Sequence, residues 1–196
     1  MQAYALSFAA LLLTLTACSP VFNWREVRPE DTALSLLLPC KPDRAEKKLS
    51  LGERPQVLRL LGCDAGGATF AVTVADVGDA SSVTAVLAAW QSATLANMKA
   101  SPPMRSGLTG AAPEKLDKAD KADKNATGAV PLKVTGAASQ PPAVLVKARG
   151  QRADGTAVSG QAAYFVQGSQ VFQVVIYAVE INPEVAETFF SSLKFE

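Results

Sequence analysis

The chain has 196 residues, of which 19 are Lys or Arg, 18 are Asp or Glu and none is His, and its net charge at pH 7 is +1. A nearly neutral chain creates no strong field to attract nucleic acid or an anionic surface, and without histidine it cannot assemble a Ser-His-Asp or Cys-His catalytic centre from its own residues. The hydrophobic fraction of 48% is sufficient for a packed core, which excludes a wholly disordered chain.

The N-terminal residues predict export and lipid attachment. An apolar run begins at Ala9 and ends in Leu15-Thr16-Ala17-Cys18, a pattern similar to the lipobox of bacterial lipoproteins, whose cysteine is acylated and whose leader is cleaved just before it. The run is too short to span a bilayer, which needs about 20 apolar residues, and a small residue before the cleavage point is typical of a secretory signal. Residues 1–5 contain no Lys or Arg, so an ordinary signal peptide and a buried apolar segment are the alternative interpretations.

This pattern predicts how the chain is divided. We expect residues 1–17 to be a lipoprotein signal peptide, Cys18 to be the lipidation site, residues 18–22 to be a lipidated tether and residues 23–196 to be a single α+β domain. Ser19 follows the cysteine, where Asp would favour retention in the inner membrane. The resemblance to Gram-negative lipoproteins therefore implies a lipid anchor on the periplasmic face of the outer membrane.

Two cysteines remain beyond the lipidation site, Cys40 and Cys63. An even number of cysteines in an oxidising compartment predicts one disulfide between them, and two separate buried thiols are the alternative. The chain has no Cys-x-x-Cys spacing for a redox centre, and two cysteines without histidine offer too few ligands for zinc. We therefore expect no metal and no cofactor, and no sequence signature marks a catalytic residue.

The first half of the domain is predicted to consist of strands followed by one helix. We expect extended segments at residues 23–28, 32–38, 44–51, 56–63 and 68–77, with turns at 52–55 and at Gly66-Gly67. A helix is predicted over residues 81–99, capped by Asp79 or Ser81 and with Lys99 in its last turn. Its apolar stripe is more typical of a buried core face than of a ligand-binding face; it consists of Val83, Val86, Leu87, Trp90, Thr94 and Met98.

Residues 100–142 differ in composition from the segments on either side. They are rich in Pro, Ala and Gly and contain few large apolar side chains, which predicts a long loop or disordered insertion. Acid–base pairs spaced four residues apart between Glu114 and Lys124 would support only a short, marginal helix. We interpret the segment as a solvated excursion, with a partner-binding arm as the alternative, and we expect deletion of residues 105–140 to cost under about 1 kcal/mol.

Regular structure is predicted again from Ala143 onward. Apolar, β-branched and aromatic residues over 144–149, 156–166 and 170–179 predict a three-stranded meander, with turns at 154–155 and 167–169. A C-terminal helix is then predicted, with Asn182 as its cap, Pro183 at its first position and a buried side formed by Val185, Phe189, Phe190 and Leu193. Blocks of strands with flanking helices predict an α+β fold with a mainly antiparallel sheet.

Three segments resemble the PsbP-like class of small α/β/α sandwiches, which includes DcrB-type bacterial lipoproteins. They are Leu36-Leu37-Leu38-Pro39-Cys40-Lys41-Pro42, the meander from Tyr164 to Val174, and the closing segment from Ala186 to Phe195 with its Phe-Phe-x-Ser-Leu pattern. The resemblance covers about residues 21–99 and 143–196. It implies a sandwich fold and an envelope location, and it transfers no functional residue.

We expect one function and consider two alternatives, because the sequence predicts a lipid anchor and a compact domain and shows no catalytic signature. We expect a non-enzymatic periplasmic lipoprotein that acts as a binding or assembly accessory of the cell envelope, with the membrane and an unidentified envelope protein as partners and no nucleic acid. A hydrolase would show a cleft with two converging carboxylates, or a serine within hydrogen-bond reach of a lysine. A carrier of a small apolar ligand would show an apolar pocket between sheet and helix.

Overall fold

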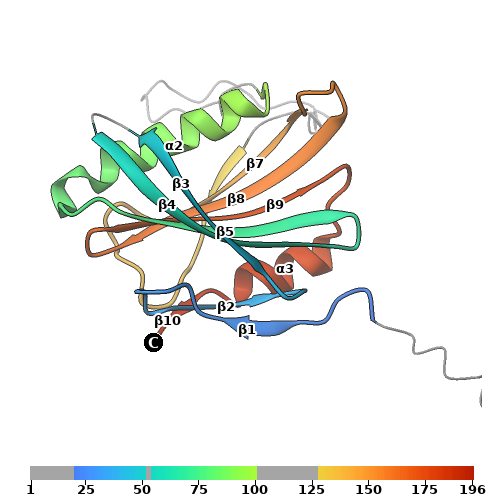
Figure 1. Ribbon diagram of the computed structural model, residues 1–196, viewed down its shortest axis with the longest axis horizontal. Helices are drawn as coiled ribbons and strands as arrows, with labels where there is room; N and C mark the ends of the chain where they lie inside the picture. Colours follow the sequence, from blue (N-terminus) through green and yellow to red (C-terminus); the bar gives the residue numbers. More distant parts are fainter. Residues whose placement is uncertain (1–19, 52–53, 101–127) are drawn as a thin grey trace, which may run out of the picture.

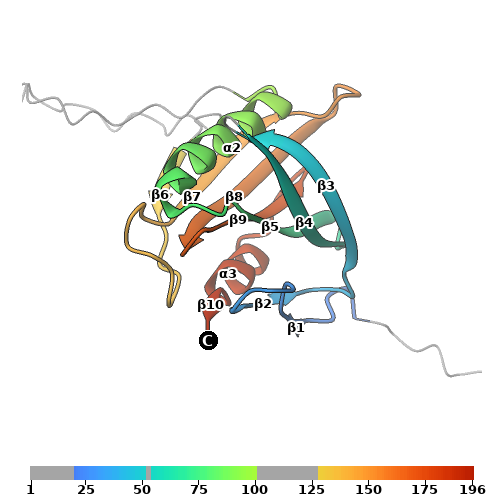
Figure 2. The same cartoon turned by 60° about the vertical axis from the view of Figure 1, so that its left-hand side comes forward.

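The computed structural model describes residues 20–51, 54–100 and 128–196. In these residues the chain forms a seven-stranded sheet and a three-stranded sheet, and neighbouring strands within each sheet are antiparallel. Figures 1 and 2 show helices α2 and α3 on opposite faces of the large sheet, with the small sheet on the same side as α3. The predicted α+β fold with a mainly antiparallel sheet is confirmed, whereas the separate small sheet was not predicted.

The elements have the following bounds. The large sheet has the order β3-β4-β5-β9-β8-β7-β6, formed by Asp43–Leu51 (β3), Arg54–Ala65 (β4), Ala68–Asp76 (β5), Gly128–Pro131 (β6), Val144–Gln151 (β7), Ala157–Gln167 (β8) and Gln170–Ala178 (β9). The small sheet has the order β1-β2-β10, formed by Arg25–Val27 (β1), Leu34–Leu38 (β2) and Lys194–Phe195 (β10). The helices are Val83–Asn97 (α2), which follows a short 3-10 turn at Ala80–Ser82, and Pro183–Ser191 (α3).

Glycine-containing turns connect the central strands. The β4–β5 turn contains Gly66 and Gly67 at φ values of 59° and 74°, and the β7–β8 turn contains Gly155 at 85°. These left-handed conformations are readily adopted only without a Cβ atom. The turns predicted at these positions are confirmed. The turn after β3 is shorter than predicted, because Leu51 pairs directly with Arg54 at the start of β4.

Side chains along the central strands point alternately to the two faces of the large sheet, and both faces are buried. Phe70, Val72 and Val74 of β5 belong to the core on the α3 face, whereas Ala71 and Ala75 belong to the core on the α2 face. A strand that is apolar on both faces is typical of the interior of a covered sheet. The prediction of a central strand at this position is therefore confirmed.

Helix α2 packs on one face through the predicted stripe. All six residues of the stripe are buried, together with Leu95, which was not predicted. The carboxylate of Asp79 accepts a hydrogen bond from the backbone N–H of Ser81 at 2.9 Å and caps the 3-10 turn, as predicted. The prediction that Lys99 lies in the last helical turn was wrong: α2 ends at Asn97, and Lys99 has a φ of 51° just after the C-cap, where the chain leaves the helix.

Helix α3 covers the opposite face. Its predicted cap is confirmed, because the side-chain oxygen of Asn182 accepts hydrogen bonds from the backbone N–H groups of Glu184 and Val185. Phe189 is fully buried and packs edge-to-face on Phe70 of β5, with ring centroids 5.3 Å apart. Aromatic pairs in this geometry contribute roughly 0.5–1.5 kcal/mol beyond the burial of their area.

The predicted disulfide is present. Cys40, just after β2, is bonded to Cys63 in β4, with Cα atoms 5.9 Å apart. Nearby, Trp24 packs edge-to-face on Phe70 and stacks on Phe22. The first described residues of the chain and the disulfide therefore both attach to the α3 side of the large sheet.

The predicted insertion at residues 100–142 was too long. Residues 128–142 include β6, which pairs with β7, and Val134, which is only 8% exposed in the core on the α3 face. The backbone N–H of Leu132 also donates to the carbonyl of Ala143. The remaining residues of the predicted insertion, 101–127, lie outside the described residues, as does the predicted short helix between Glu114 and Lys124.

In the part of the chain that the structure describes, neither helix has the length and apolar character needed to cross a membrane.

Candidate functional site

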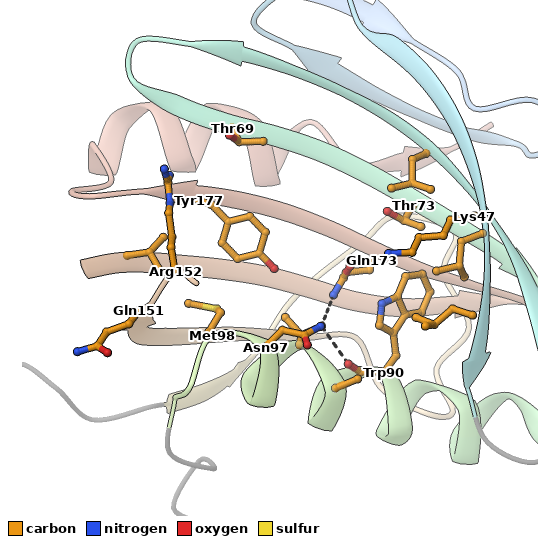
Figure 3. Close-up of a pocket in the computed structure, with 16 residues that line it drawn as sticks. Lys47, Thr69, Thr73, Trp90, Asn97, Met98, Gln151, Arg152, Gln173 and Tyr177 are labelled. Atoms are coloured by element: carbon orange, nitrogen blue, oxygen red, sulfur yellow. Dashed lines mark hydrogen bonds between the residues drawn. The ribbon is translucent and has the colours of Figure 1, made fainter. Parts of the chain in front are cut away.

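A cleft with a volume of about 490 Å³ lies between α2 and the large sheet. Its floor is formed by strands β5, β8 and β9, one side by α2 and the other by the β3–β4 hairpin (Figure 3). This volume lies within the range of roughly 300–1,000 Å³ found for small-molecule sites. The cleft is therefore large enough for a small organic ligand.

The register of the sheet places polar side chains side by side on the cleft floor. Gln173 of β9 is paired with Thr73 of β5 on one side and with Tyr164 of β8 on the other. Four residues further along β9, Tyr177 is paired with Thr69 and with Gly160. Because residues paired across neighbouring strands point to the same face, the register brings polar side chains of neighbouring strands together on the floor of the cleft.

Gln173 is the centre of a buried hydrogen-bond network. Its side-chain Nε2 donates to the hydroxyl of Thr94 on α2 at 2.7 Å and to the phenol oxygen of Tyr164 at 2.9 Å. The Thr94 hydroxyl donates in turn to the carbonyl of Trp90 at 2.9 Å. Gln173 is only 8% exposed, and a buried amide is tolerated only when such partners are present. The network therefore fixes the distance between α2 and the cleft floor.

The two tyrosines of this region are neutral at physiological pH. Burial raises the pKa of Tyr164, and its hydrogen-bonding interactions with Thr94 and Gln173 offset only part of that rise. Burial also raises the pKa of Tyr177 strongly, and the nearby Tyr164 adds to the effect. The phenol groups therefore act as hydrogen-bonding groups, and they add no negative charge to the cleft.

The formal charges of the described cleft lining are positive. Lys47 of β3 and Arg152, just after β7, contribute to the lining, and none of the described lining residues is Asp or Glu. Figure 3 shows the two cations at opposite ends, with Gln173 and Tyr177 between them. A neutral or anionic ligand therefore meets no carboxylate in the lining.

Two glycines allow the C-terminal end of α2 to approach the sheet closely. A Cβ atom on Gly150 of β7 would overlap the carbonyl oxygen of Met98, and that carbonyl accepts a hydrogen bond from the N–H of Gln151 at 2.7 Å. A Cβ atom on Gly160 of β8 would lie 2.7 Å from the terminal methyl group of Met98. A larger residue at position 150 would push the backbone of α2 outward, so Gly150 helps to set the width of the cleft, whereas at position 160 the flexible Met98 side chain can move aside.

The described cleft lining contains neither of the predicted disulfide cysteines. Cys18 lies outside the described residues, and the Cys40–Cys63 disulfide lies on the α3 side of the sheet. The α2 stripe was interpreted as core, which its burial confirms, but Trp90, Thr94 and Met98 also line the cleft. The same face of α2 both packs in the core and lines the cleft, because the sheet covers only part of that face.

The residues that give the cleft its polarity were not predicted from the sequence. Gln173 interrupts the apolar run Val171-Phe172-Gln173-Val174-Val175, and a polar residue in a strand buried on both faces is a usable signal. Lys47 carried no comparable signal, because a lysine in a charged edge strand is common. Only the pairing of β3 with β4 shows that Lys47 faces the cleft.

Comparison with protein-family models finds no matching family, and a search of curated proteins finds no match for this sequence.

Proposed function

We propose that this protein is a lipid-anchored, non-enzymatic binding accessory of the bacterial envelope, with a PsbP-like, DcrB-type domain, and that it carries a small, largely apolar ligand in the cleft beneath α2. The observation that carries the proposal is the cleft itself. It combines apolar walls, such as Leu58, Trp90 and Val158, with a few convergent polar groups around Gln173. This combination is typical of ligand-binding sites.

The position of the chain's N-terminal segment supports the proposal of a carrier held at a membrane. Phe22 and Trp24 pack on the α3 face, whereas the cleft lies on the α2 face. A lipid on Cys18, only a few residues before Phe22, would hold the α3 side near the bilayer. The cleft would then be on the far side of the sheet, where it is accessible from the periplasm.

The same cleft gives no support to a hydrolase. Its described lining contains no Asp, Glu or Ser, so it supplies neither two converging carboxylates nor the serine of a Ser-Lys pair. The described lining therefore lacks both arrangements expected of such a hydrolase, whereas its apolar walls and hydrogen-bonding groups support binding of a small ligand.

Uptake of a neutral apolar dye tests the carrier proposal. The chain without the predicted leader and Cys18, residues 19–196, is exported behind an ordinary signal peptide, purified without detergent and titrated with N-phenyl-1-naphthylamine. Trp90 lines the cleft, so energy transfer from its indole to the dye reports binding there. Trp24→Phe removes the other tryptophan of the chain, which packs on the opposite face. We expect saturable binding of one dye per chain.

A matched pair of variants on α2 locates the binding site. Ala93 lines the cleft, whereas Ala88 lies on the exposed side of the same helix. Ala93→Phe should fill the cleft and weaken dye binding at least about tenfold, which corresponds to the loss of one or two buried methylene groups of the dye. Ala88→Phe should leave the dye affinity unchanged. Absence of binding to the parent protein, or equal binding by both variants, would refute the carrier proposal.

The anchor is tested separately. Cys18→Ala in the full chain should abolish incorporation of labelled palmitate and release the protein from the membrane fraction or leave it as an unprocessed precursor. Membrane association without label in the parent protein would contradict the lipoprotein assignment and would leave the cleft experiment unaffected.

A further inference from the structure

We propose that the cleft selects a single-chain anionic amphiphile, a fatty-acid-like molecule whose carboxylate lies beside Lys47 and whose chain lies along α2. This inference rests on the proposed carrier function and names the chemical class of its ligand. It is carried by the distribution of charge around the cleft.

Lys47 is a cation directed into the cleft. Figure 3 shows its side chain extending from β3 toward Gln173 and Thr73. The ion pairs formed among the described residues do not include Lys47. Its chain neighbour Glu46 points to the opposite face of β3, because successive strand residues alternate. Its amino group is therefore available to a bound anion.

The helix and two of the floor strands that face Lys47 supply no carboxylate, and on its own strand Asp43 lies four residues away on the same face. Helix α2 contains no charged residue, and strands β8 and β9 contain none either. Lys47 is paired with Leu58, and the next residue on its own face is Leu49; both leucines line the cleft. Lys47 is itself solvent-exposed, so its ammonium group lies at the open rim of the cleft, where it can reach an anion that enters from solvent.

The other end of the cleft is less suited to an anion. Asp64 accepts a hydrogen bond from the hydroxyl of Thr69 at 2.6 Å at that end. Arg152 lies two residues from Asp154, and its charge helps to lower the pKa of that carboxyl, after the stronger effect of hydrogen bonds from Thr156. The Arg152 cation is thus partly compensated, whereas Lys47 is not. We therefore place the carboxylate of the ligand at the Lys47 end.

The walls suit the apolar part of the ligand. From Lys47 the cleft runs past Leu60, Trp90 and Ala93 toward Met98 and Val158. Each methylene group buried on this surface stabilises the complex by about 0.8 kcal/mol. The hydroxyl of Tyr177 and the amide of Asn97 add hydrogen-bond donors without adding negative charge.

Competition among three ligands of equal chain length tests the inference. Dodecanoate, dodecanol and dodecylamine are titrated, below their aggregation concentrations, against the dye-loaded Trp24→Phe protein at pH 7.5. We expect dodecanoate to displace the dye at a concentration at least about tenfold lower than dodecanol, as one charge-assisted hydrogen bond would give, and dodecylamine to be the weakest competitor.

Variants of two neighbouring lysines assign the effect to Lys47. Lys47→Gln should weaken dodecanoate about tenfold and leave dodecanol unchanged, and Lys47→Arg should keep the preference for the anion. Lys48→Gln is the matched control, because it removes one positive charge from the adjacent residue on the opposite face of β3. It should leave all three affinities unchanged.

The outcomes separate this inference from the carrier proposal. If dodecanol competes as well as dodecanoate, the inference is wrong and the carrier proposal stands. If Lys47→Gln weakens all three ligands equally, or if Lys48→Gln acts like Lys47→Gln, the selective role of Lys47 is refuted. If neither the dye nor any of the three ligands binds, the carrier proposal fails, and the inference fails with it.

Discussion

Replacement of Gly150 by Ala tests whether close contact between α2 and β7 holds the cleft in shape. A Cβ atom at this position would overlap the carbonyl oxygen of Met98 and lie 2.9 Å from its carbonyl carbon. Both are backbone atoms, so no side-chain rotation can relieve the overlap. The hydrogen bond from the Gln151 N–H to the Met98 carbonyl, now 2.7 Å long, would be lost or stretched as α2 moves away.

Two contributions determine the expected loss of stability. A lost backbone hydrogen bond costs about 1 kcal/mol, and forced displacement of packed elements costs about 1–3 kcal/mol. We expect Gly150→Ala to lower the free energy of unfolding by about 2–4 kcal/mol in total. For a domain of this size, a loss of about 3 kcal/mol lowers the melting temperature by roughly 6–12 °C.

The matched control is Gly128→Ala, because a Cβ atom on Gly128 would meet no described atom within 4 Å. That change should alter the free energy of unfolding by less than about 0.5 kcal/mol. Urea unfolding followed by circular dichroism measures both variants, and dye binding near Trp90 reports the shape of the cleft. Equal stability of Gly150→Ala and Gly128→Ala would refute the argument that contact between α2 and β7 positions the helix.

Three further changes test other parts of the fold. Replacing Cys40 and Cys63 together by Ala should lower the free energy of unfolding by roughly 3 kcal/mol, because the disulfide closes a loop with a sequence separation of 23; calorimetry under oxidising conditions measures the loss. Val134→Ala should cost about 1–2 kcal/mol in urea unfolding, since it removes two buried methyl groups from the core. Asp76→Asn should destabilise the protein at neutral pH and have less effect near pH 2. Hydrogen bonds from the Gly78 N–H and the Ser169 hydroxyl lower the pKa of Asp76 below its ordinary 3.8. The ionised carboxylate therefore stabilises the folded protein fully above pH 3.8, and this contribution is lost as the pH falls through the lower pKa of the folded state.

Each of these expectations can fail clearly. Unchanged melting of the cysteine variant would show that the disulfide does not restrict the unfolded chain. An unaffected Val134→Ala protein would restore the interpretation of residues 128–142 as a dispensable excursion. A difference between Asp76→Asn and the parent protein that stays constant from pH 7 to pH 2 would show that ionisation of Asp76 is not the cause.

Local sequence patterns determined most of the regular structure. The turns at Gly66-Gly67 and Gly155 follow from backbone conformations that favour glycine, and the caps at Asp79 and Asn182 follow from the hydrogen-bonding capacity of their side chains. The Cys40–Cys63 bond could be predicted by counting cysteines once export was assumed. The turns and caps each depend on a few neighbouring residues. The disulfide could be predicted because, once Cys18 is assigned to lipidation, each of the other two cysteines has only one possible partner.

Two short strands, β6 and β10, could not be predicted from local sequence patterns, because they form by pairing with strands distant in the sequence. β6 carries both Gly128 and Pro131, which are unfavourable in strands, and it forms because β7 offers an unpaired edge. β10 has only two residues, and it exists because Phe195 meets Leu34 across the chain. When a strand is stabilised mainly by pairing with a distant strand, its own residues need not alternate between apolar and polar. Neither β6 nor β10 was therefore predicted.

The sequence by itself determined the fold class, the order of most strands and helices, the cysteine pair and the α2 stripe, because these depend on periodicity and local chemistry. Only the tertiary structure decided that Lys47, Trp90 and Gln173, which lie on three separate elements, share one cleft. The physical reason is strand register: pairing of β3 with β4, of β4 with β5 and of β5 with β9 determines which side chains face α2. A shift of one residue in any pairing would turn the side chains of that strand to the other face.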